Sequence, residues 1–180
     1  MTVPEAATTD VPTGAEAAAW AAERVCGELR EVYLTVAAAA VLLGRAGAGS
    51  MHPELRQARR CGEEALDPAS HVEQLLGSGL ARLWDQIGGG DVTSIGRVVG
   101  SLDESRTRFA EAAERLAGLP SRLRDAERQL RETDDPRLRI VGVADDWSQA
   151  AEHLGLLTGN LTEAVGALAS YTDRITGVPA

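Results

Sequence analysis

The stretch LRIVGVADDWSQAAEHLGLLTGNLTEAVGALASYTDRIT, residues 138–176, decides the fold. Its apolar residues recur at alternating spacings of three and four over the whole segment: Ile140, Val143, Trp147, Ala150, Leu154, Leu157, Leu161, Ala164, Leu168, Tyr171 and Ile175. A repeat of this kind lines up apolar side chains along one face of an α-helix, as at the seam of a coiled coil. It therefore predicts one long helix with one buried face.

Two other segments carry the same seven-residue repeat. One comprises Leu102, Phe109, Leu116, Leu123 and Leu130, and the other comprises Ala22, Val25, Leu29, Val32, Val36, Ala39 and Leu43. Only 3% of the residues are aromatic, whereas Ala, Leu, Glu and Arg are abundant. This composition favours helices over β-sandwiches or barrels. The predicted fold class is all-α.

Clusters of turn-forming residues divide the chain at 47–50, 88–91 and 133–136. Four long helices are expected, over 14–46, 53–87, 94–132 and 138–176. We predict two tandem antiparallel hairpins, forming a bundle or an elongated coiled-coil-like domain. The expected parts are a disordered tail (1–13), hairpin 1 (14–88), a Gly-rich linker (89–93) and hairpin 2 (94–178). Similar residues open and close the second helix of each hairpin, which indicates either duplication or shared composition.

The turn positions predict how the helices align. A turn near residues 48–49 places Val25 level with Val72. A turn at Asp135 makes contacting positions sum to about 270, which places Leu123 level with Trp147. The first alignment separates the two cysteines, Cys26 and Cys61, by roughly 17 Å at 1.5 Å per residue, so both are expected to be free thiols.

Three local features qualify this picture. Pro120 is expected to kink its helix, because the heptad continues through it unchanged. At Asp67-Pro68 the helix is expected to stop and restart, since Asp caps helices well and Pro opens them. The apolar run from Val32 to Gly44, about 13 residues, is too short to span a membrane and is interpreted as buried helix.

Charge and residue usage exclude several functions. The net charge is −9, which disfavours binding to nucleic acid or anionic membranes. All 18 basic residues are Arg, and without Lys there is no Schiff-base or P-loop lysine. No secretory signal is readable, so a cytoplasmic location is expected, although signal-less export through a specialised system leaves no N-terminal mark.

No residue pattern indicates catalysis, a metal or a cofactor. The three histidines, His52, His71 and His153, lie far apart, and Cys61 has no nearby His or Asn. The chain is predicted not to be an enzyme and to have no cofactor. Two groups are interaction candidates. Leu80, Leu83, Trp84 and Ile87 extend past the start of the first helix in this alignment and are expected to pack on the second hairpin or on another subunit. The second group is the basic set Arg122, Arg124, Arg128 and Arg131. The alternative for the basic set is a solvated flank of Arg–acid pairs.

The Ala-rich, lysine-free helical hairpins without a signal peptide resemble the WXG100 (ESX-type) proteins of type VII secretion. They also resemble uncharacterised small helical proteins of actinomycetes, and the Arg usage resembles that of a high-GC bacterial genome. Trp84-Asp85-Gln86 falls at a helix end, whereas the family has Trp-x-Gly in its turn, so no site residue is carried over.

The sequence favours a non-enzymatic scaffold or adaptor that binds a protein partner or its own copies through helical faces. Two alternatives are a type VII-like secretion substrate or its chaperone, and a bundle that binds a small molecule between the hairpins.

Overall fold

The computed structural model describes residues 14–46, 53–88, 94–132 and 142–177. Almost all of these residues are helical, and none of them forms a strand. The helices are α1 (Gly14–Ala46), α2 (Pro53–Gly88), α3 (Ile95–Ala117), α4 (Leu119–Glu132) and α6 (Val143–Thr176). The all-α prediction is confirmed for this part of the chain. The predicted tail 1–13 and linker 89–93 lie outside it.

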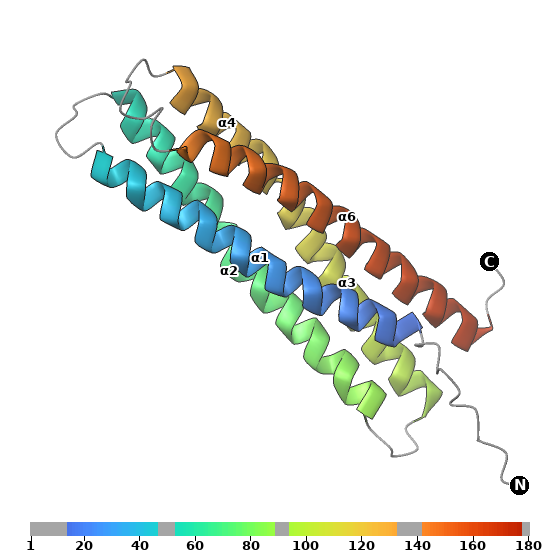
Figure 1. The fold of residues 1–180 in the computed structure, drawn as a ribbon. Helices are drawn as coiled ribbons and strands as arrows, with labels where there is room; N and C mark the ends of the chain where they lie inside the picture. The colour runs from blue at the N-terminus through green and yellow to red at the C-terminus, as the bar shows by residue number, and fades with distance from the viewer. Residues whose placement is uncertain (1–13, 47–52, 89–93, 133–141, 178–180) are drawn as a thin grey trace, which may run out of the picture.

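The helices form four rods that lie side by side, with α3 and α4 together making one rod (Figure 1). α1 packs against α2 and α6, and these two also pack against α3 and α4. The chain direction alternates from each rod to the next, so neighbouring rods are antiparallel (Figure 1). The start of α1 therefore lies beside the end of α6, where Gly14 packs against Tyr171.

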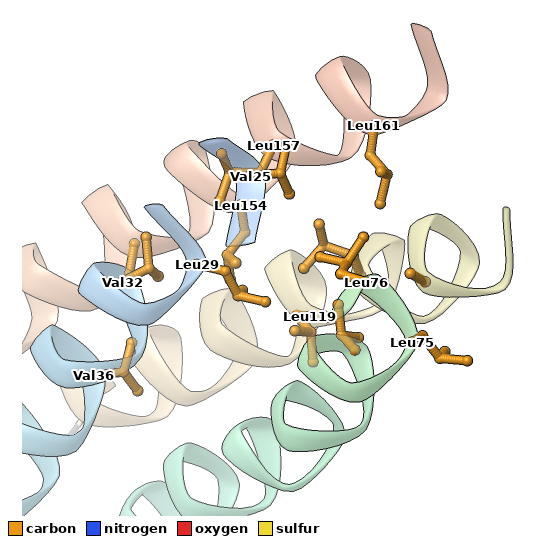
Figure 2. Packing of buried hydrophobic residues seen from close by; sticks show 14 of the residues in the cluster. Val25, Leu29, Val32, Val36, Leu75, Leu76, Leu119, Leu154, Leu157 and Leu161 are labelled. Carbon is orange, nitrogen blue, oxygen red and sulfur yellow. The ribbon is translucent and has the colours of Figure 1, made fainter. Parts of the chain in front are cut away.

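One continuous cluster of buried side chains joins all the helices. Figure 2 shows Leu29 of α1 and Leu154 of α6 pointing into an interior that also holds Leu76 of α2 and Leu119 of α4. The seams expected from the heptads are buried wherever the structure describes them, apart from Tyr171 and Ile175, which are partly buried. Burial of each large apolar side chain stabilises the fold by about 1.5–3 kcal/mol.

Two aromatic side chains are accommodated by glycines of α2. A Cβ on Gly62 would lie 2.7 Å from Trp147, and a Cβ on Gly79 would lie 2.6 Å from Phe109. Both aromatic side chains are fully buried, although the indole N–H of Trp147 has no hydrogen-bond partner among the described residues. The absence of side chains at Gly62 and Gly79 thus lets the largest side chains of α3 and α6 pack directly against the backbone of α2.

The stop and restart expected at Asp67-Pro68 is wrong, whereas near Pro120 the helix is disturbed and the heptad continues, as expected. α2 runs unbroken through Pro68, because Ala69, Val72 and Leu76 continue its buried face. The helix near Pro120 is instead interrupted at Gly118, which separates α3 from α4. Gly118 keeps helical dihedral angles (φ −80°, ψ −17°), so the buried stripe continues in phase on both sides.

The helix alignment also differs from the prediction. Arg30 pairs with Glu73, whereas a turn at residues 48–49 would place it level with residue 67. Arg131 pairs with Asp145, whereas a turn at Asp135 would place it level with residue 139. Both contacts lie six positions further along the second helix, close to a shift of one heptad. Cys26 is a free thiol, as expected, whereas the side chain of Cys61 lies outside the described residues.

Candidate interaction surface

The run Val32–Gly44 in α1 contains no charged residue, and only one of its faces is buried. Val32, Val36 and Leu43 lie in the core, whereas Leu34 and Val41 are 70% and 54% exposed. The expectation that the whole run is buried is therefore wrong. The interior is occupied by the other rods on one side of α1 only, so apolar side chains on its opposite side face outward.

Four residues spaced seven apart form the centre of this outward face: Trp20, Gly27, Leu34 and Val41. We call them the outer stripe. Trp20 is 56% exposed, and a Cβ on Gly27 would meet nothing within 4 Å. Leu42, also exposed, lies beside the stripe. An apolar strip along one exposed helix face is typical of interaction sites, whereas scattered single apolar residues are not.

Ion pairs border the outer stripe on both sides. Toward α2, Arg30 Nε donates to Glu73 Oε1 at 2.5 Å, and this hydrogen bond raises the pKa of Arg30. Arg30 and Glu73 also line a shallow groove of about 330 Å³ beside Leu34. Toward α6, His153 Nε2 lies 2.8 Å from Glu28 Oε2. The C-terminal half of the outer stripe, around Leu34 and Val41, is thus an apolar strip between polar edges, the pattern of an apolar core with a polar rim. In its N-terminal half the exposed charged residues Glu23, Arg24 and Glu31 lie between Trp20 and Leu34.

Cys26 lies on the side of α1 that faces α2. Burial raises the pKa of its thiol, Arg30 opposes this increase, and Glu73 and Glu23 add to it. A thiol with a raised pKa is mostly protonated near neutral pH and is a poor nucleophile. This environment does not favour the reactivity of a catalytic cysteine.

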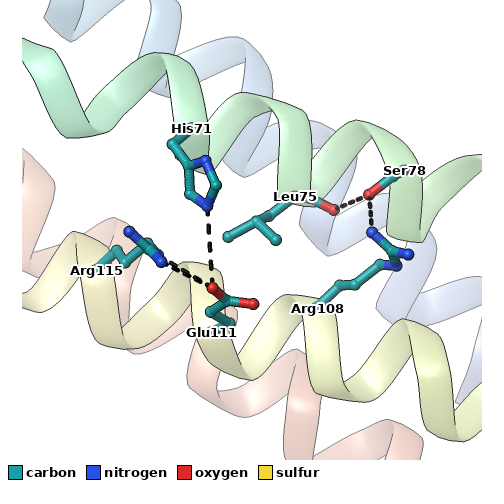
Figure 3. A network of polar contacts seen from close by, with 6 residues as sticks. All are labelled: His71, Leu75, Ser78, Arg108, Glu111 and Arg115. Carbon is teal, nitrogen blue, oxygen red and sulfur yellow. Dashed lines mark hydrogen bonds and ion pairs between the residues drawn. The ribbon is translucent and has the colours of Figure 1, made fainter.

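A polar network joins α2 and α3 on another side of the molecule (Figure 3). Glu111 accepts a hydrogen bond from Arg115 and lies 3.9 Å from His71. Arg108 donates to the hydroxyl of Ser78. These side chains are satisfied within the chain and hold two helices together, so the network is structural.

The residues proposed from sequence do not form one surface. Leu80 and Leu83 are buried in the core, and Trp84 and Ile87 pack against it. All four pack within this chain, so they do not offer an exposed surface to a partner.

The four arginines of α4 are exposed but face different ways. Arg122 lines a groove with Pro68 of α2, Arg128 pairs with Asp125, and Arg131 pairs with Glu127 and Asp145. At 100° per residue, Arg124 lies on the outward side of α4, away from Arg122. Two of the four arginines, Arg128 and Arg131, thus form local ion pairs of the kind that the solvated-flank alternative describes.

The described residues offer little other chemistry. Over the described ranges no group of three or more His, Cys, Asp or Glu residues could hold a metal. The apolar void between Leu29, Leu119 and Leu154 measures only about 10 Å³, the size of one water molecule. Within the helices described, none is long and apolar enough to cross a membrane.

Comparison with known proteins finds no matching family model, curated protein or solved structure. The outer stripe was missed from sequence, although its signal was present: Trp20, Leu34 and Val41 share a second seven-residue spacing beside the buried one.

Proposed function

We propose that this chain is a non-enzymatic scaffold, a bundle of two helical hairpins that binds protein through the outer stripe of α1. The observation that carries the proposal is the exposure of Leu34 and Val41 on a stretch of α1 that is free of charge between Glu31 and Arg45, with Trp20 exposed on the same side of the helix nearer its N-terminus. Water contact with these side chains is unfavourable, and a partner that covers each one gains about 1.5–3 kcal/mol.

The rigidity of the bundle supports this role. α1 is held on two sides by α2 and α6 and is buried along its entire inner seam, so its outer face is already ordered before a partner arrives. A preformed helix face avoids much of the conformational entropy that binding otherwise loses. Docking of an apolar helix face into another helical surface is a common recognition mode.

Site-specific photo-crosslinking in cells of the source organism tests this function. Benzoylphenylalanine replaces Leu34 in one variant and Leu156 of α6 in the matched control, where the native leucine is 69% exposed. We expect a crosslinked protein from position 34 and none from position 156. No adduct at position 34, or equal adducts at both positions, would contradict the proposal.

A further inference from the structure

The outer stripe has a feature that a generic apolar face lacks, which is complementarity to itself. We propose that a second copy of this chain covers it, with the two α1 helices antiparallel and facing positions summing to 61. This inference rests on the proposed function and specifies the partner. It describes a closed two-fold dimer, in which the same patch is used by both copies.

The order of side-chain sizes supports this pairing. Positions 20 and 41 sum to 61, as do positions 27 and 34, so Trp20 meets Val41 of the other copy and Leu34 meets Gly27. Each large side chain faces a smaller one. Gly27 has open space above its backbone, which leaves room for the Leu34 side chain of the other copy. The two-fold axis lies between positions 30 and 31.

A parallel pairing of the same faces fits poorly. It would place Trp20 against its own copy and Gly27 against its own copy, which crowds one level and leaves a gap at the next. It would also bring Glu31 against Glu31 and Arg30 against Arg30. Like charges that face each other destabilise a helix pair. The sizes and the charges at the axis therefore both select the antiparallel arrangement.

Charge at the axis is complementary under the same rule. Positions 30 and 31 sum to 61, so Glu31 of each copy faces Arg30 of the other. Each copy thus contributes a carboxylate opposite the guanidinium of the other, on both sides of the axis. Arg30 also pairs with Glu73 of its own chain.

The length of the contact sets its strength. From position 20 to position 41 the helix extends about 32 Å at 1.5 Å per residue. A single helix pair of this length falls at the lower end of interface sizes, where complexes are reversible. We expect a dimer that dissociates on dilution into the micromolar range.

Sedimentation equilibrium on the full chain tests the assembly. The wild-type chain should show a reversible monomer–dimer equilibrium, and Leu34→Glu should weaken association at least tenfold. Leu156→Glu is the matched control, with the same charge placed at an equally exposed leucine, and should associate like the wild type. A wild-type chain that is monomeric at about 0.5 mM, or a control that dissociates as strongly, overturns the inference.

Disulfide trapping tests the orientation. In a background with Cys26→Ser and Cys61→Ser, two chains with different tags carry Gly27→Cys or Leu34→Cys. The mixed 27–34 disulfide should dominate, because positions 27 and 27 of the two copies lie about 10 Å apart along the axis, beyond the ~7 Å that a disulfide spans. Dominant 27–27 and 34–34 disulfides would establish a parallel pair and overturn the inference.

Failure of this inference is distinguishable from failure of the proposed function. A monomeric chain that photo-crosslinks to a different protein through position 34 overturns self-association and leaves the scaffold function standing. A monomeric chain with no adduct at position 34 contradicts both.

Discussion

α1 and α6 are nearly equal in length, 33 and 34 residues, and their inner faces are alike. Each has a heptad seam that is buried along almost all of its length. Their outer faces differ. α1 exposes Trp20, Leu34 and Val41, whereas α6 exposes one large apolar side chain, Leu156, among polar neighbours such as Glu152 and Glu163.

This difference separates two properties of the molecule. The inner seams fill a shared core, so their side chains set the stability of the fold. The outer faces contribute little to that core, so their composition is free to serve association. Because the outer face of α1 exposes more large apolar side chains than that of α6, the proposed association is assigned to α1.

The largest expected effect comes from the inner seams, and it should be similar in both helices. We predict that Leu29→Ala in α1 and Leu161→Ala in α6 each reduce the free energy of unfolding by about 2–5 kcal/mol. Both side chains are almost fully buried, and truncation removes apolar contact and leaves a cavity. Chemical denaturation at low protein concentration, where the chain is monomeric, measures this.

The matched outer changes, Leu34→Ala and Leu156→Ala, serve as controls. Both should alter the unfolding free energy of the monomer by no more than about 0.5 kcal/mol, the range of surface substitutions. An outer change as damaging as Leu29→Ala would erase the distinction between the faces.

The glycines of α2 give the next largest effect. Gly62→Ala should destabilise the fold by about 1–3 kcal/mol, because its Cβ would lie 2.7 Å from Trp147. Gly77→Ala, in the same helix but with no atom within 4 Å of its Cβ, should instead stabilise by up to about 1 kcal/mol through helix propensity. If Trp147 packs this closely on Gly62, thermal unfolding of the two variants gives shifts in melting temperature of opposite sign. Equal shifts would contradict it.

Sequence periodicity predicts well which residues are buried. It predicts less well which residues of the neighbouring helix they contact. The three seams follow from spacing alone, because a helix turns by a fixed angle at each residue. Alignment between helices does not follow in the same way. A heptad seam moved by seven positions presents the same kinds of residue, so Leu123 can lie near Leu154 as readily as near Trp147. The observed offset of six positions is close to the seven-position shift that the repeat cannot distinguish.

The prolines and the outer stripe show a second limit. Local capping rules suggested a break at Pro68, but the buried neighbours Ala69 and Val72 keep α2 helical, so packing overrides propensity. The apolar run Val32–Gly44, which contains Leu34, predicts a buried stretch of helix. Only the placement of α2 and α6 reveals that its side of α1 has no covering helix within the chain.

A smaller effect concerns the flank of α1 that faces α2. Because burial raises the pKa of the Cys26 thiol, its alkylation rate should reach half-maximum at a higher pH in the folded chain than in the unfolded chain. The thiolate favours the unfolded state. This group's contribution to stability is therefore complete below the unfolded pKa and declines as the pH rises above it. Iodoacetamide kinetics across pH in a Cys61→Ser background measure the midpoint.

Arg30→Gln should move that midpoint further upward, because the guanidinium lowers the pKa of Cys26. If the alkylation midpoint of the folded chain with Arg30 in place is equal to or below that of the unfolded chain, the described burial of Cys26 is contradicted.

The smallest effects are expected from the ion pairs on the two edges of the outer stripe. Double-mutant cycles on Arg30–Glu73 and on Glu28–His153 should each give a coupling of about 0.2–1 kcal/mol, because all four side chains remain partly exposed and solvent screens them. Arg30 is always charged, so its coupling should stay constant between mildly acidic and mildly basic buffer. Urea denaturation of each single and double variant supplies the cycles, and Thr35→Ala, an exposed change on α1 outside both pairs, serves as the control. A coupling well above 1 kcal/mol at either edge would mean that the rim contributes to the fold as the seams do, and the contrast between inner and outer faces would then have to be redrawn.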